Sequence, residues 1–351
     1  MGVVKQMSQL KLIVPGLLGP FTSAIPDYIQ QQFKQPVFNE LNKWLSRAEL
    51  TSTSARNYFE TLVSEIAPQY ESGICQLTAT HDEIDLSGGY FYRADPVHFK
   101  AESDHAILIG SEFLDPSFDE SKQLIDVFNQ HFMEDKLSLH ASSADRWYLK
   151  CESPLELDFS ALDYALGRDI KHFMPKGKDE LWWRKIVNEA QMLFFQHEVN
   201  QQRELKGQSG INGLWLWDLF TEHEIKEVNI IENTKIIADD IVAIALAKQS
   251  GFEINAPTGH FENTELTQNN VLVTDMLYMP VCYGDLEAWV DSVANFCQST
   301  LSLISTLLKT KAIDEVYIYP CDGRVFQVDR RQLAKFWKPV KTVDHFVSNV
   351  N

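Results

Sequence analysis

The sequence predicts an α/β protein in which a mostly parallel sheet core carries an inserted, smaller α+β domain. Before residue 75 and after residue 176, apolar segments of strand length alternate with helical periodicity, which is typical of a parallel sheet flanked by helices. Between them, short alternating segments separated by turn residues indicate an antiparallel sheet. We therefore expect residues 1–75 and 176–351 to form the core and residues 76–175 to form the inserted domain.

The first part of the core begins with an apolar strand. Residues 10–14 are Leu-Lys-Leu-Ile-Val, and this strand is expected to end at Pro15–Gly16. Helical periodicity then extends over residues 27–50, and a second helix is expected over residues 56–66.

The rest of the chain divides into the inserted domain and a return to alternating strands and helices after Pro175–Lys176–Gly177. In the insertion we expect strands at residues 84–86, 90–92, 98–100 and 106–109, a helix at 118–132, and strands at 137–140 and 147–151. After it we expect a helix at 179–197, a strand at 214–217, a helix at 241–249, a strand at 271–275, a helix at 285–308, and strands at 316–319 and 325–328.

Composition excludes several classes of function. The formal net charge is −18, from 49 acidic and 31 basic residues, which argues against general binding of nucleic acid or of anionic membranes. A small anionic ligand held by a few local arginines remains compatible with that charge. No run of eighteen apolar residues predicts a membrane span. The five cysteines are scattered without the spacing of a structural zinc site, so we expect reduced thiols and a cytoplasmic protein.

An unusual density of polar residues lies in and after the expected helix at 179–197. Burying amides and imidazoles is costly unless they are paired, so the set predicts either one shared polar site or one satisfied internal network. The residues concerned are Asn188, Gln191, His197, Asn200, Arg203 and Asn212. His197, Asn200 and Arg203 could bind an anion or another polar ligand. Alternatively, they could lie at the end of a helix, where His197 and Asn200 cap free carbonyls and Arg203 pairs with a carboxylate.

Two more arginines are candidates for holding an anion. Arg93 follows an aromatic-rich strand and could present its guanidinium to a phosphate or carboxylate, or could pair with Asp95 to close a turn. Arg146 precedes Trp147–Tyr148, and its alternative role is that of an edge-strand arginine over an aromatic surface.

Carboxylates that follow expected strands are the best candidates for a metal. They are Asp239, Asp240 and Asp275, and the last of them ends an apolar strand, where sites of α/β proteins gather. A two-metal hydrolase also needs imidazoles close in space, and the ten histidines form no close pair in the sequence. No nucleophile elbow, phosphate-binding loop or dinucleotide fingerprint occurs.

Several of these segments, in this order, resemble the archaeal-type cofactor-independent phosphoglycerate mutases. The similar segments are residues 92–95, 146–149, 188–212, 256–260 and 284–285. The arrangement also resembles a proteobacterial family named for the regulation of pathogenicity factors, type E. The resemblance implies an alkaline-phosphatase-like α/β core with an inserted domain, and in the mutases two metals activate a serine nucleophile.

The departures from the mutases concentrate on their catalytic machinery. Pro15 stands where the mutases have a metal-binding aspartate, and Tyr278 and Cys282 stand at two further metal-ligand positions. No serine nucleophile can be matched between residues 50 and 75. Without metals and nucleophile, phosphoryl transfer has neither a charge clamp nor a covalent route.

We therefore expect a mutase-related protein that has lost phosphoryl transfer, uses no cofactor and keeps a pocket for a small anionic, phosphorylated ligand. Its role would be sensing, regulation or protein interaction. The residues expected to bind the ligand are Arg93, Arg146, Asn188, His197, Asn200, Arg203 and Asn212. One alternative is an active mutase or phosphomonoesterase with Mn or Zn at a site rebuilt from Asp239, Asp240, Asp275 and His260. Another is a protein-binding partner whose Asn/His/Arg network has only a structural role.

Overall fold

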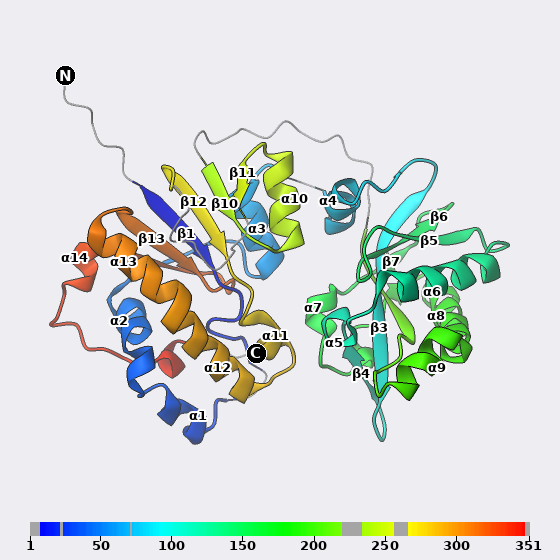
Figure 1. The fold of residues 1–351 in the computed structure, drawn as a ribbon, viewed down its shortest axis with the longest axis horizontal. Helices are drawn as coiled ribbons and strands as arrows, with labels where there is room; N and C mark the ends of the chain where they lie inside the picture. The colour runs from blue at the N-terminus through cyan, green and yellow to red at the C-terminus, as the bar shows by residue number, and fades with distance from the viewer. Residues whose placement is uncertain (1–7, 22–23, 71, 220–233, 256–265, 348–351) are drawn as a thin grey trace. The chain divides into compact units, whose positions relative to one another are not determined.

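The computed structural model describes residues 8–21, 24–70, 72–219, 234–255 and 266–347. The chain divides into two compact units, one formed by Met1–Tyr70 with Lys226–Asn351 and the other by Glu71–Ile225 (Figure 1). The second unit contains the expected insertion at 76–175 and extends beyond it to residue 225. It therefore also contains the polar segment between residues 188 and 212.

The first unit is built on a seven-stranded sheet in the order β11-β10-β12-β1-β13-β14-β2. The pairs β11–β10, β10–β12, β12–β1 and β1–β13 are parallel, and only β14 and β2 run antiparallel to their neighbours. The strands are β1 Gln9–Ile13, β2 Glu49–Ser52, β10 Thr234–Ile237, β11 Glu253–Asn255, β12 Asn269–Val273, β13 Glu315–Tyr319 and β14 Arg324–Asp329. The mixed α/β class with a large, mostly parallel sheet is thus confirmed.

Helices pack on this sheet and bury its apolar faces (Figure 1). They are α1 Asp27–Gln32, η1 Pro36–Phe38, α2 Asn39–Arg47, α3 Tyr58–Ile66, α10 Ile241–Gln249, α11 Tyr278–Cys282, α12 Leu286–Phe296, the π-helical η4 Cys297–Leu301, α13 Ser302–Thr310, α14 Arg330–Leu333 and η5 Val343–Phe346. The single helix expected over 27–50 is wrong. Pro36 interrupts it because proline supplies no amide proton to a helix interior, and residues 49–52 join the sheet.

The second unit is built on an antiparallel sheet in the order β4-β3-β6-β5, with β9 paired to β3. Its elements are α4 Ile74–His81, β3 Tyr90–Ala101, β4 Ala106–Ile109, α5 Ser111–Leu114, α6 Phe118–His131, β5 Leu137–Ala141, β6 Trp147–Cys151, β7 Leu157–Asp158, α7 Leu162–Ala165, η2 Ile170–His172, β8 Lys176–Gly177, α8 Glu180–Gln196, α9 Glu198–Leu205 and β9 Gly213–Leu219.

Two strand predictions for this unit were wrong. Residues 84–86 form no strand. Ile84 and Leu86 instead pack against a small buried cluster that includes Phe91 and Tyr148. The segments at 90–92 and 98–100 belong to one continuous strand, β3, which changes partner along its length from β6 to β9 and β4. No helix in the described part of the chain is long and apolar enough to cross a membrane.

Candidate functional site

Arg93 lies on β3 in the interior of the second unit and is held by a carboxylate two residues away. Its Nη2 donates to both carboxylate oxygens of Asp95, at 2.7 and 2.8 Å, and its Nε donates to the same group at 3.1 Å. Its Nη1 donates to Oγ1 of Thr78 on α4, at 3.1 Å. Both charged side chains are almost completely buried. Residues two apart on a strand lie on one face, which brings this pair together.

Aromatic rings close the surroundings of this ion pair. The indole Nε1 of Trp217 donates to Asp95 at 2.6 Å, and the Arg93 guanidinium lies 5.0 Å from the centre of the Trp217 ring. The ring of Tyr148 lies 5.6 Å from the same guanidinium. Burial lowers the pKa of Arg93, but the Asp95 carboxylate more than offsets it, so the pKa is raised and the arginine stays charged. Arg93 therefore has the alternative role weighed above, that of an internal ion pair.

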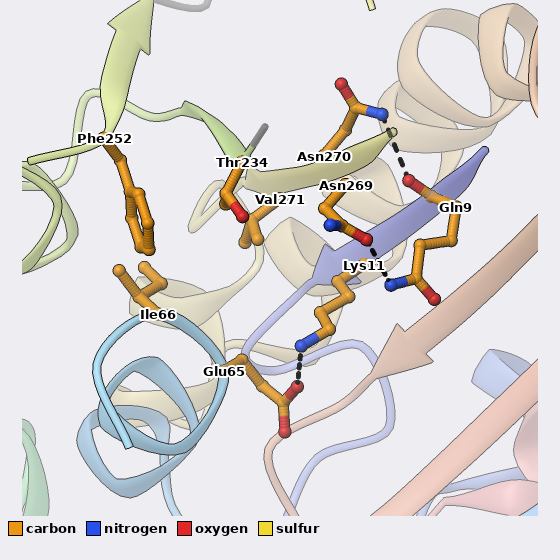
Figure 2. A pocket seen from close by; sticks show the side chains of 9 residues that line it. All are labelled: Gln9, Lys11, Glu65, Ile66, Thr234, Phe252, Asn269, Asn270 and Val271. Atoms are coloured by element: carbon orange, nitrogen blue, oxygen red, sulfur yellow. Dashed lines mark hydrogen bonds and ion pairs between the residues drawn. The ribbon is translucent and has the colours of Figure 1, made fainter. Parts of the chain in front are cut away.

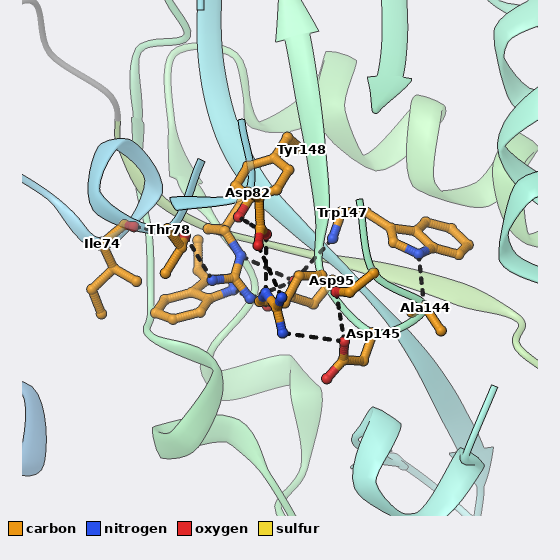
Figure 3. Close-up of polar contacts among 12 residues, drawn as sticks. Ile74, Thr78, Asp82, Asp95, Ala144, Asp145, Trp147 and Tyr148 are labelled. Carbon is orange, nitrogen blue, oxygen red and sulfur yellow. Dashed lines mark hydrogen bonds and ion pairs between the residues drawn. The ribbon is translucent and has the colours of Figure 1, made fainter. Parts of the chain in front are cut away.

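Arg146 forms a second ion pair beside the first. Its Nε and Nη2 donate to the two carboxylate oxygens of Asp82, at 3.0 and 2.9 Å, and the hydroxyl of Tyr148 donates to the same carboxylate at 2.7 Å. Burial raises the pKa of Asp82, but these hydrogen bonds and the Arg146 charge outweigh it and hold the pKa below its usual range. Figure 3 shows the Asp82 and Asp95 carboxylates with Tyr148, whose hydroxyl donates to Asp82 and whose ring lies 5.6 Å from the Arg93 guanidinium.

Arg146 differs from Arg93 in its access to solvent. Its side chain is 18% exposed, against 6% for Arg93, while its partner Asp82 is 4% exposed. The Asp82 carboxylate binds the Nε and Nη2 side of the Arg146 guanidinium, and Asp145 lies 3.5 Å from its Nη1. Of the two arginines, Arg146 is the one that an anion from solvent can approach.

Arg203 on α9 is buried and has three internal acceptors. Its Nε donates to the carbonyl of Ser209 at 2.8 Å, its Nη1 donates to Glu120 at 2.9 Å, and its Nη2 donates to the carbonyl of Leu114. Glu120 is the third residue of α6 and forms the capping box of that helix with Ser117. Arg203 thus connects three segments of the second unit, and it pairs with a carboxylate as the structural alternative expected.

The asparagines and histidine of the polar segment also have local partners. The side-chain amide of Asn200 donates to the backbone carbonyls of Phe194 and Ile211, both at 2.8 Å. Its oxygen accepts from the backbone N–H of Ile211 at 2.7 Å. His197 caps the start of α9 by accepting from the amide of Val199 at 3.2 Å.

Asn212 and Asn188 complete the predicted set and lie in different surroundings. Asn212 bonds to the backbone of Phe99 in both directions, accepting from its amide at 2.7 Å and donating to its carbonyl at 3.2 Å. Asn188 is exposed on α8. Among the seven predicted ligand-binding residues, Arg93 and Arg146 have surroundings that are linked through Tyr148. Asn200 and Arg203 bond to the segment that follows α9, at Ile211 and Ser209.

Most partners of these residues could not be found from the sequence. Asp82, Thr78 and Glu120 were not singled out, although they bond to the three arginines. The one available signal was the spacing of Arg93 and Asp95, which puts both side chains on one face of a strand. Asp82 and Glu120 lie 64 and 83 residues from their arginines, so no local pattern announces them.

The carboxylates predicted for a metal lie in the first unit, at the carboxyl edge of the parallel sheet. Asp239 and Asp240 follow β10, and Asp275 follows β12, its neighbour in the sheet. Burial raises the pKa of Asp240 to about 6, and the nearby Asp275 adds to the rise; the amide of Ala243 donates to Asp240 at 2.7 Å and opposes it. Burial and Asp239 likewise raise the pKa of Asp275.

Tyr58, at the start of α3, belongs to the same surroundings. Burial raises the pKa of its hydroxyl well above the usual value, and the charges of Asp240 and Asp275 raise it further. Its ring packs edge-on against Tyr278 of α11, with ring centres 5.2 Å apart. The hydroxyl is enclosed and lies close enough to Asp240 for the two groups to influence each other.

The residues of this edge do not fit the two-metal centre of a mutase. In the ranges that the structure describes, no group of three or more His, Cys, Asp or Glu side chains is arranged to hold a metal ion. The strand β1 is followed by Val14 and Pro15, neither of which offers a metal-binding side chain. Asp240 caps α10 instead of pointing a free carboxylate outward. His260, the remaining predicted ligand, lies outside the described residues.

A small cavity lies at the opposite, amino edge of the same sheet (Figure 2). Its volume is about 40 Å³, and its walls include Gln9, Lys11, Glu65, Thr234 and Asn269. Lys11 pairs with Glu65 at 2.8 Å, and Gln9 donates to Asn269 at 2.6 Å. Pockets for metabolites measure about 300 Å³ or more, so this cavity has room for ordered water only.

Comparisons with known proteins give a distant relation. No protein-family profile matches the chain. The chain is 23% identical over 153 residues to the 2,3-bisphosphoglycerate-independent phosphoglycerate mutase of Methanosarcina mazei, a match covering 42% of this chain and 37% of that protein. The similarity thus spans well under half of the length of this curated relative, and it supports a distant relation to phosphoglycerate mutases.

Two solved structures are also similar to the chain. One is the cofactor-independent phosphoglycerate mutase of Thermoplasma acidophilum, with a TM-score of 0.43, 10% identity, and coverage of 98% of this chain and 96% of that one. The other is the PH0037 protein of Pyrococcus horikoshii, with a TM-score of 0.44, 13% identity, and coverage of 95% and 93%.

Proposed function

We propose that this protein is a non-catalytic relative of the phosphoglycerate mutases, with an alkaline-phosphatase-like core and a regulatory or sensing role in the cytoplasm. The observation that carries the proposal is the state of the carboxyl edge of the parallel sheet. There Pro15 follows β1 after Val14, and Asp240 is half-buried, caps a helix and has a pKa of about 6. All five cysteines are free and buried, which supports a reducing compartment.

The charges at this edge of the sheet bear on whether phosphoryl transfer can occur there. Phosphoryl transfer spreads negative charge over the oxygens of the transferred group, and enzymes stabilise it with metal ions and arginines. The carboxylates at this edge oppose such an anion unless metal ions neutralise them; Asp240 is half-buried, and Asp239 and Asp275 are exposed. Arg93 and Arg203 cannot serve instead, because each is almost completely buried and is also paired with a carboxylate of the protein. The charges at this edge therefore support the proposal that the protein does not catalyse the mutase reaction.

The proposal includes a small anionic, phosphorylated ligand, and Arg146 is the residue that best supports it. Its side chain keeps 18% of its surface exposed, and its ion pair with Asp82 fixes the guanidinium in one orientation. An anion would add to the exposed side of this fork without breaking the internal pair. No cofactor is part of the proposal.

Metal binding tests the loss of catalysis. The metal content of the purified protein is measured, and manganese and zinc are then titrated by calorimetry. We expect no specific binding and no turnover of 3-phosphoglycerate. Tight binding of two ions per chain, with turnover that Asp275→Asn removes, would establish the alternative of an active metal-dependent enzyme.

That alternative has one observation in its favour. Asp240 and Asp275 have raised pKa values and influence each other and Tyr58, and perturbed carboxylates of this kind gather at functional sites. A rebuilt site for phosphomonoester hydrolysis would use them with Asp239 and His260. It predicts that Asp275→Asn lowers metal affinity at least tenfold, which the calorimetry would detect.

Thermal melting tests the ligand. We expect 3-phosphoglycerate or inorganic phosphate to raise the melting temperature of the wild-type protein, and Arg146→Ala to abolish that rise. Arg184→Ala is the matched control, because Arg184 is exposed on α8 and forms only a surface ion pair with Glu180. A rise of equal size in Arg146→Ala would exclude Arg146 as the binding residue.

A further inference from the structure

The first unit carries a basic and aromatic segment that the proposed function does not use. Residues 330–341, here called the basic strip, contain five Lys or Arg residues and no Asp or Glu. The strip carries +5 in a chain of net charge −18, so the remaining residues carry −23. Such a local reversal of charge makes this strip an exception on an acidic protein.

The strip exposes large apolar side chains between its cations. Phe336 is 81% exposed, Trp337 is 68% exposed and Val340 is 51% exposed, and the two aromatic rings pack edge-on with centres 5.4 Å apart. Arg330 pairs with Asp314 at 3.2 Å. The other four cations have no ion pair in the part of the chain that the structure describes; they are Arg331, Lys335, Lys338 and Lys341.

The strip is anchored to the chain just before β2. The guanidinium of Arg47 donates to the carbonyl of Leu333, and the amide of Lys341 donates to the hydroxyl of Ser46 at 2.8 Å. That hydroxyl also lies 3.3 Å from the carbonyl of Lys341. Next to the first anchor, Gln332 lies 3.4 Å from Glu49, the first residue of β2. Both ends of the strip, with the aromatic pair between them, are therefore tied to the chain at or just before the start of this strand.

β2 is an edge strand of the seven-stranded sheet. It pairs with β14 on one side and ends the strand order on the other, and all four of its residues are exposed, with Leu50 at 57%. An edge strand directs alternate N–H and C=O groups away from its sheet, where another extended chain can pair with them. This edge thus offers backbone partners on the strand whose start is tied to the basic strip.

We propose that β2 and the basic strip together form a docking surface for an extended, acidic segment of a partner protein. The segment pairs with the outer edge of β2, its carboxylates face Lys335, Lys338 and Lys341, and its alternate apolar side chains cover Phe336 and Trp337. Strand addition of this kind draws affinity from main-chain hydrogen bonds and specificity from alternate side chains. The surface lies outside the candidate site and does not depend on the proposed function.

The acidic remainder of the chain favours a peptide over a membrane. A charge of −23 opposes an anionic lipid surface that extends under the whole molecule. A single acidic segment presents its charge only at the strip, within about one Debye length, so the remainder repels it less. A lipid surface also makes no use of the open strand edge.

The test uses the full-length protein and a fluorescein-labelled hexapeptide in which Glu alternates with Val and Phe. Fluorescence anisotropy should show saturable binding that weakens at least tenfold between 50 and 500 mM NaCl, as opposite charges require. K335E/K338E and, separately, F336A/W337A should each weaken binding at least tenfold. The same peptide with Lys in place of Glu should not bind.

Matched variants elsewhere separate the surface from general effects of charge and hydrophobicity. K122E/K206E changes the net charge by the same amount at exposed lysines of the second unit, and L181A/F195A removes equally exposed apolar side chains there. Both should bind the peptide as the wild type does. Circular dichroism confirms that every variant is folded.

Strand pairing itself is tested on the peptide, which leaves the protein unchanged. Methylation of alternate peptide nitrogens in one register should abolish binding, and in the other register should be tolerated, because only every second amide faces β2. Equal binding of both methylated peptides would refute strand addition. Absence of binding, or equal loss in the matched variants, would overturn the docking surface. The docking surface would also be overturned if the peptide does not bind and the protein instead binds vesicles with 30% phosphatidylserine in a way that depends on Trp337.

Discussion

Arg203→Ala should destabilise the second unit strongly. The guanidinium is 1% exposed and donates to the carbonyls of Leu114 and Ser209 and to the Glu120 carboxylate. The buried Leu114 carbonyl left without its donor costs about 1–3 kcal/mol, and the loss of the bond to the carbonyl of the exposed Ser209 costs about 1 kcal/mol. The ion pair contributes less, about 1 kcal/mol, because Glu120 is 20% exposed and keeps its capping bond to the amide of Ser117. We expect a total loss of about 3–5 kcal/mol, in the range of a broken buried pair.

The assay is urea unfolding followed by tryptophan fluorescence, since Trp147, Trp183 and Trp215 are buried in this unit. Arg203→Lys should lose an intermediate amount, because an ammonium cannot reach all three acceptors of the fork. Arg184→Ala, at an exposed pair on α8, should lose less than about 0.5 kcal/mol. A loss below about 1 kcal/mol for Arg203→Ala would refute the structural role and return this residue to the candidates for ligand binding.

Two further predictions concern the polar segment and the carboxylates. Asn200→Ala should lower the free energy of unfolding by about 2–4 kcal/mol, because three buried hydrogen bonds are lost, whereas exposed Asn188→Ala should change it little; urea unfolding of both variants checks this. Burial raises the folded-state pKa of Asp240 to about 6. The stability that its protonated carboxyl group gives to the folded state is therefore fully present below about pH 4 and is lost as the pH rises through 6. Relative to Asp240→Asn, the wild type should therefore lose roughly 1–3 kcal/mol between pH 4 and 7, measured in EDTA; a constant difference would contradict the raised pKa.

Three of the five parallel strands could be predicted because their apolar character is local, whereas β10 and β11 were not predicted. The segment predicted at 10–14 is β1, and the apolar runs predicted at 271–275 and 316–319 are β12 and β13, each within two residues. A strand buried on both faces needs a continuous apolar run, and that requirement is visible in five consecutive letters. The edge strand β2 was not predicted, because all its residues are exposed and its sequence therefore needs no apolar run.

The roles of the candidate site residues could not be predicted, because they depend on contacts between distant segments. The sequence shows that Arg146 and Arg203 have charges to neutralise, but the carboxylates that neutralise them come from a helix end and from the cap of another helix. A ligand phosphate and an internal carboxylate make the same demand on a guanidinium. Only the three-dimensional structure distinguishes between them.

This equivalence also bears on how a mutase-related protein can lose catalysis and keep its fold. An arginine that holds a phosphate in an enzyme becomes an unpaired buried charge when the ligand is lost, at a cost of several kcal/mol. A nearby carboxylate removes that cost, as Asp95 does for Arg93 and Glu120 for Arg203. Arg93 and Arg203 would then be retained for stability alone, and the motif would persist in the sequence without its ligand. Replacing both Arg93 and Asp95 by apolar residues of similar size should therefore cost less stability than replacing either one, an outcome that a ligand-binding arginine does not require.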